Sequence, residues 1–563
     1  MISVNIDQRL ERFENEIRYS FDFLFQTMGY GHRFVQDPNQ VGPRDILILY
    51  WMIHPSPEEL YNFARNNITI YIPAESFLYF KSEMSPEKIR SQLQEIKLPT
   101  STPVLSEKKI PEIPLEVYAG SDIYGGKFNF DLVGNIYFHL AGLEEEADRK
   151  RDRHGRYPDT ASAFLEYRDF PFLHHFLWAM DRMLRDQVNK KKLVLAQRTY
   201  WPQGQTMAAV VSHDIDRLQK WNLNSLTYSV FEDIKLFISF RWRSLLKNIS
   251  SKLKYIFTNY EMYWNFEEYL VLDKNHNVKS TYYLSPLKSD DVDYDACKDE
   301  EIQEMIKHIQ AEGHDLGIYD TWRKTDTDHL RRMKINFQKL TGLPEYGIRH
   351  MNASITAQKL GVQQNQRILY DSSLGFIERM GFRRGVAFPF YPYFDNMRSS
   401  HVEIPINIKD ECLRISKYKE IPLEKAKAHF KKLIENAQKG NGLISIDFCL
   451  SNYEEITYQE RLYSYALELL KTKSVFFTVA REIAEWWDMR KQVTIEEGEF
   501  EISIFFPNPM KHFTVKLHGD VVISEISGVE ATQDNQCITF RNIRANQIAI
   551  IEIKQRNQKA DVI

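Results

Sequence analysis

The chain is poor in cysteine. Four cysteines occur in 563 residues, and none of them belongs to a C-x-x-C pair or to a closely spaced group. This spacing excludes a disulfide framework and favours free thiols in a reducing compartment. The residues after Met1 alternate polar and apolar side chains without the apolar core of a signal peptide. The sequence therefore predicts a cytoplasmic protein.

Excess positive charge and long apolar runs are also lacking. The 73 Lys and Arg residues are outnumbered by 77 Asp and Glu, which gives a net charge of −4. A chain without a global positive field has nothing to attract nucleic acid phosphates, so we expect no nucleic acid partner. No window reaches the roughly 18 uncharged apolar residues of a membrane span. With 43% hydrophobic residues and modest glycine and proline contents, the chain is typical of a folded globular protein.

Three domains are predicted from changes in the pattern along the chain. Residues 1–190 combine a helical pattern near the start with strands at 45–50 and 68–72, which indicates an N-terminal α+β domain. Residues 200–489 alternate apolar runs with helical stretches. Residues 490–563 contain short alternating strands separated by turn residues, which is typical of a small β-sandwich.

The middle region predicts a distorted parallel (β/α) barrel. Its apolar runs end in polar clusters, as strands do at the functional end of such a barrel. The runs are 208–211, 280–284, 316–319, 346–349, 386–390, 402–408, 443–448 and 475–479.

Two carboxylates end the first of these runs. Since successive strand residues point to opposite faces, Asp214 and Asp216 share one side and Ile215 faces the other. Close carboxylates repel each other unless a cation lies between them, so the pair suggests a base beside a metal ligand. The alternative is that the pair caps the helix that follows.

Two charged segments allow two interpretations each. Residues 144–156 are strongly charged and form either a solvated surface or a polar loop along the face of the next domain. Residues 231–260 are helical, aromatic and basic. They form either a helix packed on the barrel or a helix that lies on a membrane surface.

Several motifs together resemble the NodB-type polysaccharide deacetylases. Ser212–Asp216 (S-H-D-I-D) is similar to that family's T-H-D-V-D motif, and Gly313–Tyr319 (G-H-D-L-G-I-Y) to its G-H-E-I-G-L-H motif. Tyr346–His350, 370–376, 381–385 and 403–406 follow in the family's order. The segment from Phe130 to Pro158 resembles the domain that precedes the deacetylase module in a bacterial subgroup.

The resemblance implies a metal-dependent hydrolase, with zinc or another divalent metal held by an Asp and two His residues. Asp214 would be the catalytic base, Asp216 a metal ligand, and Arg349 would orient Asp214 or the substrate. The family's H-x-x-x-H element is replaced here by Tyr319 and, four residues later, Arg323. Cys449 stands where the family places a further histidine.

These replacements remove the usual imidazole ligands, because a neutral phenol binds metal weakly and a guanidinium repels it. His213, His314, His350 and Cys449 all lie near predicted strand ends and could rebuild a zinc site. Alternatively, Arg323 or Arg349 pairs with the two carboxylates in place of a cation, and no metal binds.

The sequence leaves two functions open. One is hydrolysis of an N-acyl group on a bacterial surface polysaccharide or its glycan precursor. The other is a catalytically degenerate barrel that binds carbohydrate or assists assembly, with aromatic stacking surfaces. Those surfaces would come from Tyr319, Trp322, Phe388, Phe390, Tyr391 and Tyr393. In both cases Tyr319, Trp322 and Cys449 would contact the substrate. Asp214, Asp216, Tyr319, Arg349 and Cys449 are expected together at the barrel mouth.

Overall fold

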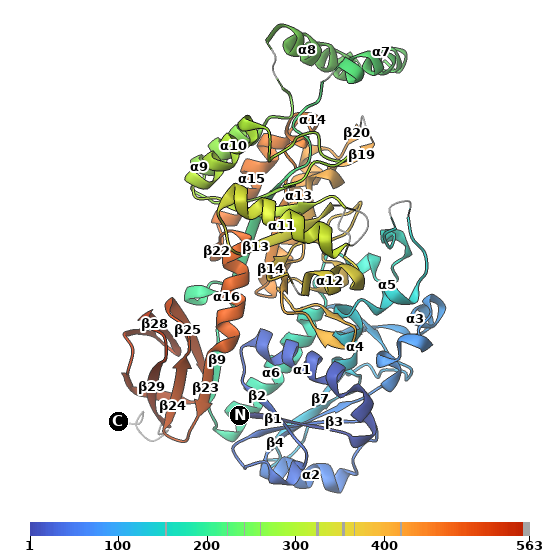
Figure 1. The fold of residues 1–563 in the computed structure, drawn as a ribbon. Coiled ribbons are helices and arrows are strands. Elements are labelled where there is room, and N and C mark those ends of the chain that lie inside the picture. The colour runs from blue at the N-terminus through green and yellow to red at the C-terminus, as the bar shows by residue number, and fades with distance from the viewer. Residues whose placement is uncertain are drawn as a thin grey trace.

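The computed structural model describes the chain except for residues 153–154, 222, 241, 259–260, 323–325, 352–354, 365, 417–418 and 556–563. In Figure 1 the barrel lies above the N-terminal region and the C-terminal β region, which are next to each other, and a helical hairpin stands beyond the barrel. Within the described residues, no helix combines the length and the apolar character needed to cross a bilayer.

A nine-stranded, parallel sheet forms the middle region, as the alternation of strands and helices predicts. Its order is β17-β14-β13-β12-β11-β10-β21-β18, and β22 also pairs with β10. The strands are β10 (Met207–Ile215), β11 (Thr281–Leu284), β12 (Asp315–Asp320), β13 (Tyr346–His350), β14 (Ile368–Asp371), β17 (Val402–Glu403), β18 (Ile408–Lys409), β21 (Leu443–Asp447) and β22 (Val475–Phe477).

The two edges of this sheet are joined by one extended segment, 402–409. Its first residues pair with β14 and its last with β21. Between these ends, Ile404 N donates to Asp371 O and Asn407 N donates to Ser445 O. The sheet therefore curls round into a barrel that is distorted along this segment, which confirms the predicted fold class.

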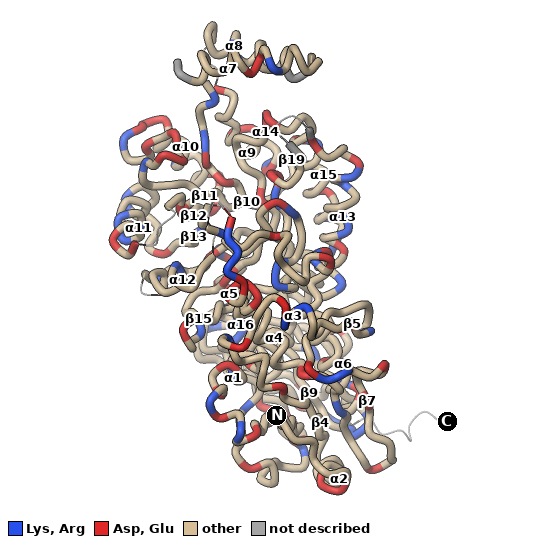
Figure 2. The backbone as a smooth tube through the Cα atoms, turned by 90° about the vertical axis from the view of Figure 1, so that its right-hand side faces the viewer, with Lys and Arg blue, Asp and Glu red and all other residues tan. Residues whose placement is uncertain are grey.

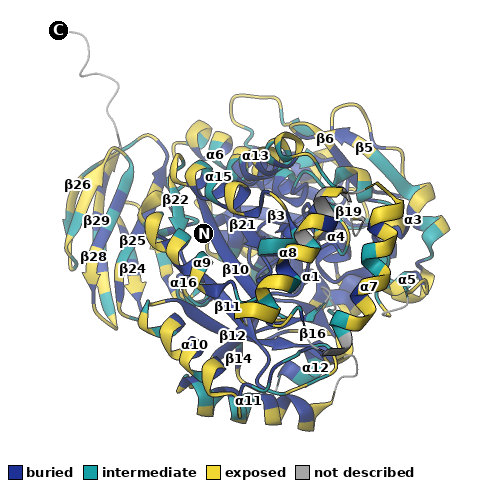
Figure 3. Ribbon diagram, turned by 90° about the horizontal axis from the view of Figure 1, so that it is seen from above, coloured by how far each residue is buried: buried dark blue, intermediate teal, exposed yellow. Residues whose placement is uncertain are grey.

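Helices surround the barrel because the crossover between parallel strands needs a helix to cover the sheet. Apolar residues of α9, α10, α11, α13 and α15 pack on the strands, which lie in the dark blue, buried interior of Figure 3. The covering helices are α9 (Phe266–Asn275), α10 (Glu300–Ala311), α11 (Thr327–Thr341), α12 (Ala357–Gln364), α13 (Leu423–Lys439), α14 (Asn452–Glu455), α15 (Gln459–Lys471) and α16 (Ala480–Gln492). Two short hairpins, β15 (Tyr393–Phe394) with β16 (Met397–Arg398) and β19 (Arg414–Ser416) with β20 (Lys419–Glu420), extend the loops.

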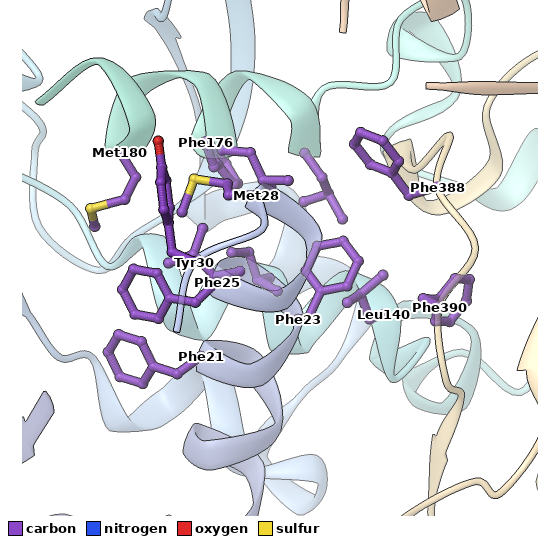
Figure 4. Packing of buried hydrophobic residues seen from close by; sticks show 14 of the residues in the cluster. Phe21, Phe23, Phe25, Met28, Tyr30, Leu140, Phe176, Met180, Phe388 and Phe390 are labelled. Atoms are coloured by element: carbon purple, nitrogen blue, oxygen red, sulfur yellow. The ribbon is translucent and has the colours of Figure 1, made fainter. Parts of the chain in front are cut away.

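The prediction of a strand at 386–390 is wrong. These residues lie outside regular strands, and Phe390 makes an isolated bridge to Glu403. Their apolar side chains are buried for another reason, since they pack against the N-terminal region (Figure 4). Phe388 stacks on His174, with ring centroids 4.2 Å apart.

The N-terminal region contains a six-stranded sheet of order β2-β1-β3-β4-β8-β7. It combines helices and strands as expected, and most of its strand pairs are parallel because α1 and α2 act as crossovers. The strands are β1 (Ile2–Ile6), β2 (His32–Val35), β3 (Ile46–Trp51), β4 (Ile68–Pro73), β7 (Leu115–Val117) and β8 (Gly125–Phe128), with a separate hairpin of β5 (Leu93–Lys97) and β6 (Ser101–Leu105). The helices are α1 (Glu14–Met28), α2 (Pro57–Asn66), α3 (Pro86–Gln92), α4 (Leu132–Leu140), α5 (Leu143–Ala147) and α6 (Leu173–Lys191).

The C-terminal region has two four-stranded antiparallel sheets, β23-β24-β29-β26 and β27-β28-β25-β9. The strand β9 (Leu195–Arg198) comes from the connection before the barrel and pairs with β25. The other strands are β23 (Thr494–Glu497), β24 (Glu501–Phe506), β25 (Met510–His518), β26 (Val521–Ser527), β27 (Ala531–Asp534), β28 (Cys537–Ile543) and β29 (Gln547–Gln555). The domain boundaries near 190–200 and 489–490 remain predictions, and the first connection contributes a strand to the C-terminal sheet.

The charged segment 144–156 combines both of its interpretations. Glu145, whose side chain is 15% exposed, lies against the barrel, where it pairs with Arg383 and Arg384. Arg149 and Lys150 are exposed, and Figure 2 shows the alternating charges of this segment around α5. The segment thus contacts the barrel through Glu145 and exposes Arg149 and Lys150 to solvent.

The basic segment 231–260 is helical over residues 231–238 and 242–258, as predicted. It belongs to α7 (Leu223–Ile238) and α8 (Trp242–Thr258), which form a hairpin. The expectation that it packs on the barrel is wrong, because the hairpin stands away from the barrel (Figure 1). Phe231 and Phe257 are 67% and 80% exposed.

Candidate functional site

The carboxyl ends of β10, β13 and β21 bring three ionisable side chains into the barrel interior. Asp214 is the penultimate residue of β10, Arg349 is the penultimate residue of β13, and Asp447 ends β21. All three are at least 97% buried. Neighbouring parallel strands point in one direction, so their polar ends meet at one mouth.

Arg349 is the centre of this cluster. Its Nη1 atom donates to Asp214 Oδ1 at 2.8 Å, to Asp447 Oδ1 at 2.5 Å and to Ser212 Oγ at 2.8 Å. Its Nε and Nη2 atoms donate to the carbonyl oxygen and the hydroxyl of Ser372, each at 3.0 Å. The guanidinium therefore lies between the two carboxylates and holds both in place.

Lys409 supplies a second positive charge to the same carboxylates. Burial and the neighbouring Asp447 raise the pKa of Asp214, while Arg349 and Lys409 act in the opposite direction. Burial alone would lower the pKa of Lys409, but Glu411, Asp447 and Asp214 raise it above its ordinary value. With Lys409 and its neighbour Glu411 included, the cluster has two cations, Arg349 and Lys409. They lie near three carboxylates, Asp214, Asp447 and Glu411.

Asp216 follows β10 and lies at the edge of a cavity in the mouth. Burial raises its pKa to about 6. Ser451 Oγ donates to its Oδ2 atom at 3.2 Å, while its Oδ1 atom is buried without a hydrogen-bond partner among the described residues. A buried acceptor without a partner can receive a hydrogen bond from a ligand hydroxyl.

Tyr319 and Cys449 lie close to these carboxylates, and both hold their protons. Burial, reinforced by Asp214 and Asp216, raises the pKa of Tyr319 well above its ordinary value. Burial and the surrounding acidic groups, Asp410 foremost, also raise the pKa of Cys449. A neutral phenol and a neutral thiol serve as hydrogen-bonding groups rather than as strong metal ligands.

The mouth contains a cavity of about 470 Å³, a volume within the range of small-molecule sites. Its lining is mostly charged, with two tyrosines and a methionine among the polar groups. The lining residues are Asp216, Arg217, Tyr263, Asp291, Tyr319, Met351, Lys409, Glu411, Arg414, Ser451, Asn452 and Glu455.

Trp322 lies away from this lining. It stacks on His329 of α11 with ring centroids 4.2 Å apart, and it is 39% exposed. Trp322 is not among the described residues that line the cavity. Its assignment to substrate binding remains a prediction.

The three candidate histidines face away from the barrel interior. His213 packs between Tyr269 and Tyr282, and His350 lies 2.8 Å from Asp320 Oδ2 on the helix side of β13. His314, before β12, accepts a hydrogen bond from Ser280 N. Because His213 and His350 are next to the inward-facing Asp214 and Arg349, strand alternation turns them outward.

The residues present do not fit the zinc site that the resemblance implies. Ligand atoms of Asp214, Asp447 and Cys449 lie within 4.8 Å of one another, but Arg349 already bonds both carboxylates. Zinc would have to displace a guanidinium and ionise a thiol whose pKa is raised. Arg323, the other proposed counter-charge, lies outside the described residues. The metal-ligand role of Asp216 remains a prediction.

Two participants in the cluster, Asp447 and Lys409, were missed by sequence reasoning. Asp447 lies near the end of the predicted run 443–448, and Asp214 lies just after the run 208–211, so a carboxylate near the end of an apolar run was the available signal. Lys409 directly follows the predicted run 402–408, so its position after an apolar run gave a signal of the same kind.

A family model matches the N-terminal region of the chain. Residues 8–187 match a family of unknown function, DUF7033. A comparison with curated protein sequences finds no match.

Solved structures similar to this chain include polysaccharide deacetylases. A candidate polysaccharide deacetylase from Mycobacterium smegmatis is 15% identical, with a TM-score of 0.35, and the match covers 54% of this chain and 98% of that one. PuuE allantoinase is 14% identical, with a TM-score of 0.36 and coverages of 51% and 92%. The carbohydrate deacetylase Agd3 is 9% identical, with a TM-score of 0.36, and the match covers 98% of each chain. At these values the fold assignment rests on the chain's own strand pairing.

Proposed function

We propose that this chain is a polysaccharide-deacetylase-like protein whose barrel binds a carbohydrate without metal-dependent hydrolysis. The observation that carries the proposal is that, among the described residues, Asp216 belongs to no group of three possible metal ligands. His213 and His350 face the helices, and the phenol of Tyr319 keeps its proton. A barrel can keep its cleft while losing the chemistry of its relatives, because function depends on the site and not on the fold.

The cavity supports carbohydrate as the ligand class. Sugars offer many hydroxyl groups, and the lining supplies acceptors in Asp216 and Glu411 and donors in Lys409 and Arg414. Tyr319 and Tyr263 add aromatic rings at the same mouth. Mixed hydrogen-bonding groups beside aromatic rings are suited to an uncharged or weakly charged glycan.

A second candidate function is hydrolysis of an N-acyl group on a sugar. It is favoured by Asp216, whose pKa of about 6 is close to the range in which a carboxylate serves as a general base. In this case Asp216 would take a proton from water, and Lys409 would stabilise negative charge that develops on the acyl oxygen.

Binding and hydrolysis can be separated in one experiment. Purified protein is titrated by calorimetry with N-acetylated and deacetylated glycan oligomers, and acetate release from the acetylated oligomers is measured in parallel. The proposal predicts binding with acetate release at background. Glu411→Gln should weaken binding, while Glu424→Gln, on an exposed position of α13, should leave it unchanged.

Acetate release above background that is lost in Asp216→Asn would contradict the proposal and support the second candidate. Absence of binding to every oligomer would contradict both.

A further inference from the structure

The hairpin of α7 and α8 stands beyond the mouth of the barrel and is not used by the proposed site. Figure 1 shows it standing away from the barrel, to which the chain connects it at both ends. The chain leaves the barrel after Asp216 and returns before α9. Arg217 and Tyr263, on these two connections, both line the mouth cavity. The hairpin is therefore attached at the rim of the site.

Exposed apolar side chains are concentrated on this hairpin. Of the 28 large hydrophobic residues that are exposed in the described part of the chain, 13 lie between residues 223 and 258. Isolated exposed apolar residues are ordinary on a protein surface, whereas a contiguous group marks an interaction site. On α8 they follow helical spacing at Trp242, Leu246, Ile249, Leu253 and Ile256.

The apolar stripes of the two helices lie on the same side of the hairpin. Asp233 of α7 lies on the side of that helix that faces α8. It accepts a hydrogen bond from Asn248 of α8 and forms an ion pair with Lys252 of α8. Ile234 is the residue after Asp233, and Ile249 is the residue after Asn248. One residue corresponds to a rotation of about 100° about the helix axis, so on each helix the apolar stripe lies about 100° in the same sense from the side that contacts the other helix. In two antiparallel helices, equal turns bring both stripes to one face.

The hairpin is also the basic part of an acidic chain. Residues 223–258 contain six Lys and Arg and two Asp and Glu, a net charge of +4, while the whole chain carries −4. Two copies of the hairpin would therefore repel each other electrostatically, whereas an anionic surface would attract it.

We propose that the apolar face of the α7–α8 hairpin docks on an anionic lipid bilayer and lies in its interface without crossing it. An amphipathic helix pair with aromatic side chains on one face and basic residues elsewhere has the chemistry of such a surface-bound element. Phe231, Phe237, Trp242 and Phe257 supply the aromatic side chains, and all four are exposed. An uncharged partner surface would not be attracted by the net positive charge of the hairpin, whereas an anionic bilayer would.

Docking would hold the barrel mouth close to the bilayer, because both connections of the hairpin line the cavity. The glycan would then be one attached to, or assembled at, a membrane. This extension of the inference rests on the proposed function, while the docking itself does not.

The test is cosedimentation of the full chain with vesicles, without glycan. Vesicles of phosphatidylcholine with phosphatidylglycerol are compared with vesicles of phosphatidylcholine alone. Wild-type protein should bind the anionic vesicles more strongly, and high salt should reduce the difference. The triple variant Phe231→Gln, Leu253→Gln, Phe257→Gln should bind at least about tenfold more weakly, because three apolar anchors are lost.

A matched control replaces three exposed apolar residues elsewhere, in the triple variant Ile335→Gln, Phe500→Gln, Val522→Gln, and should bind as wild type does. The double variant Lys235→Gln, Lys254→Gln should lose the preference for anionic vesicles. Equal binding by wild type and the hairpin triple variant would overturn the proposal. So would a wild-type dimer that this variant dissociates, because the face would then be a self-association surface.

Glycan binding in solution separates the two proposals. The hairpin triple variant should keep it, since none of its substituted residues lines the cavity. Loss of vesicle binding with intact glycan binding supports docking. Vesicle binding without any glycan binding would leave docking supported and contradict the proposed function.

Discussion

Arg349 donates a 2.8 Å hydrogen bond from Nη1 to Asp214 Oδ1, and the same nitrogen also bonds Asp447. One guanidinium, carried by β13, thus links that strand through the barrel interior to strands β10 and β21, which neighbour each other. A buried cation between two buried carboxylates is stable as a group, while any member left alone is costly. The cluster therefore has a structural role whatever the barrel does chemically.

Arg349→Met should destabilise the protein by about 3–5 kcal/mol, because two carboxylates would remain buried without their main counter-charge. The control Arg398→Met, at a partly exposed arginine, should change the free energy of unfolding by less than about 1 kcal/mol. Urea unfolding followed by tryptophan fluorescence measures both. A loss below about 1 kcal/mol for Arg349→Met would show that the carboxylates are neutral or solvated.

Zinc should bind weakly or not at all. The guanidinium of Arg349 and the neutral thiol of Cys449 leave no set of free ligands at Asp214 and Asp447. Metal analysis of protein after dialysis should find substoichiometric zinc, both in wild type and in Asp216→Asn. Stoichiometric zinc that survives dialysis and disappears in Asp216→Asn would contradict this expectation and restore the ligand role predicted for Asp216.

Asp216→Asn should stabilise the protein at neutral pH by about 1–2 kcal/mol. Burial raises the pKa of Asp216 from 3.8 to about 6, so the folded state favours the protonated form. The stability contributed by this group is complete below pH ~4 and is lost as the pH rises through about 6.

Thermal unfolding at several pH values measures this difference. Wild type and Asp216→Asn should converge at acidic pH and separate above about pH 6. The control Asp520→Asn, at an exposed position, should follow wild type at each pH. An Asn variant that is less stable at pH 7 would mean that the ionised carboxylate is favourably paired.

Glu145→Gln should weaken the contact between the N-terminal region and the barrel. Burial would raise the pKa of Glu145, but Arg383 and Arg384 together lower it to about 2. Such a group stabilises the folded state above its ordinary pKa of 4.5, and this contribution is lost as the pH falls toward 2. The variant should lose about 2–3 kcal/mol at neutral pH.

Calorimetric unfolding of Glu145→Gln should show a lower midpoint at neutral pH and a smaller difference from wild type in acid. Glu146→Gln is the matched control, because Glu146 is next to Glu145 but pairs with Lys81 at the surface. Equal effects of the two substitutions would indicate that the contact does not depend on the buried pairs.

Much of the barrel could be predicted from its sequence, because buried parallel strands have long apolar runs that end in polar residues. β10 and β21 are of this kind, and their polar ends, Asp214 and Asp447, meet in the interior. The segment 386–390 has the same apolar pattern but packs against the N-terminal region, and periodicity does not separate a strand from such a segment.

The sequence by itself determined the polar groups available to the mouth, namely Asp214, Asp216, Tyr319, Arg349 and Cys449. Tertiary structure alone decided which of them touch. It directed His213 and His350 outward through strand alternation, and it brought Arg349 between Asp214 and Asp447. It also left the apolar face of α7 and α8 uncovered, because burial depends on neighbours from distant parts of the chain.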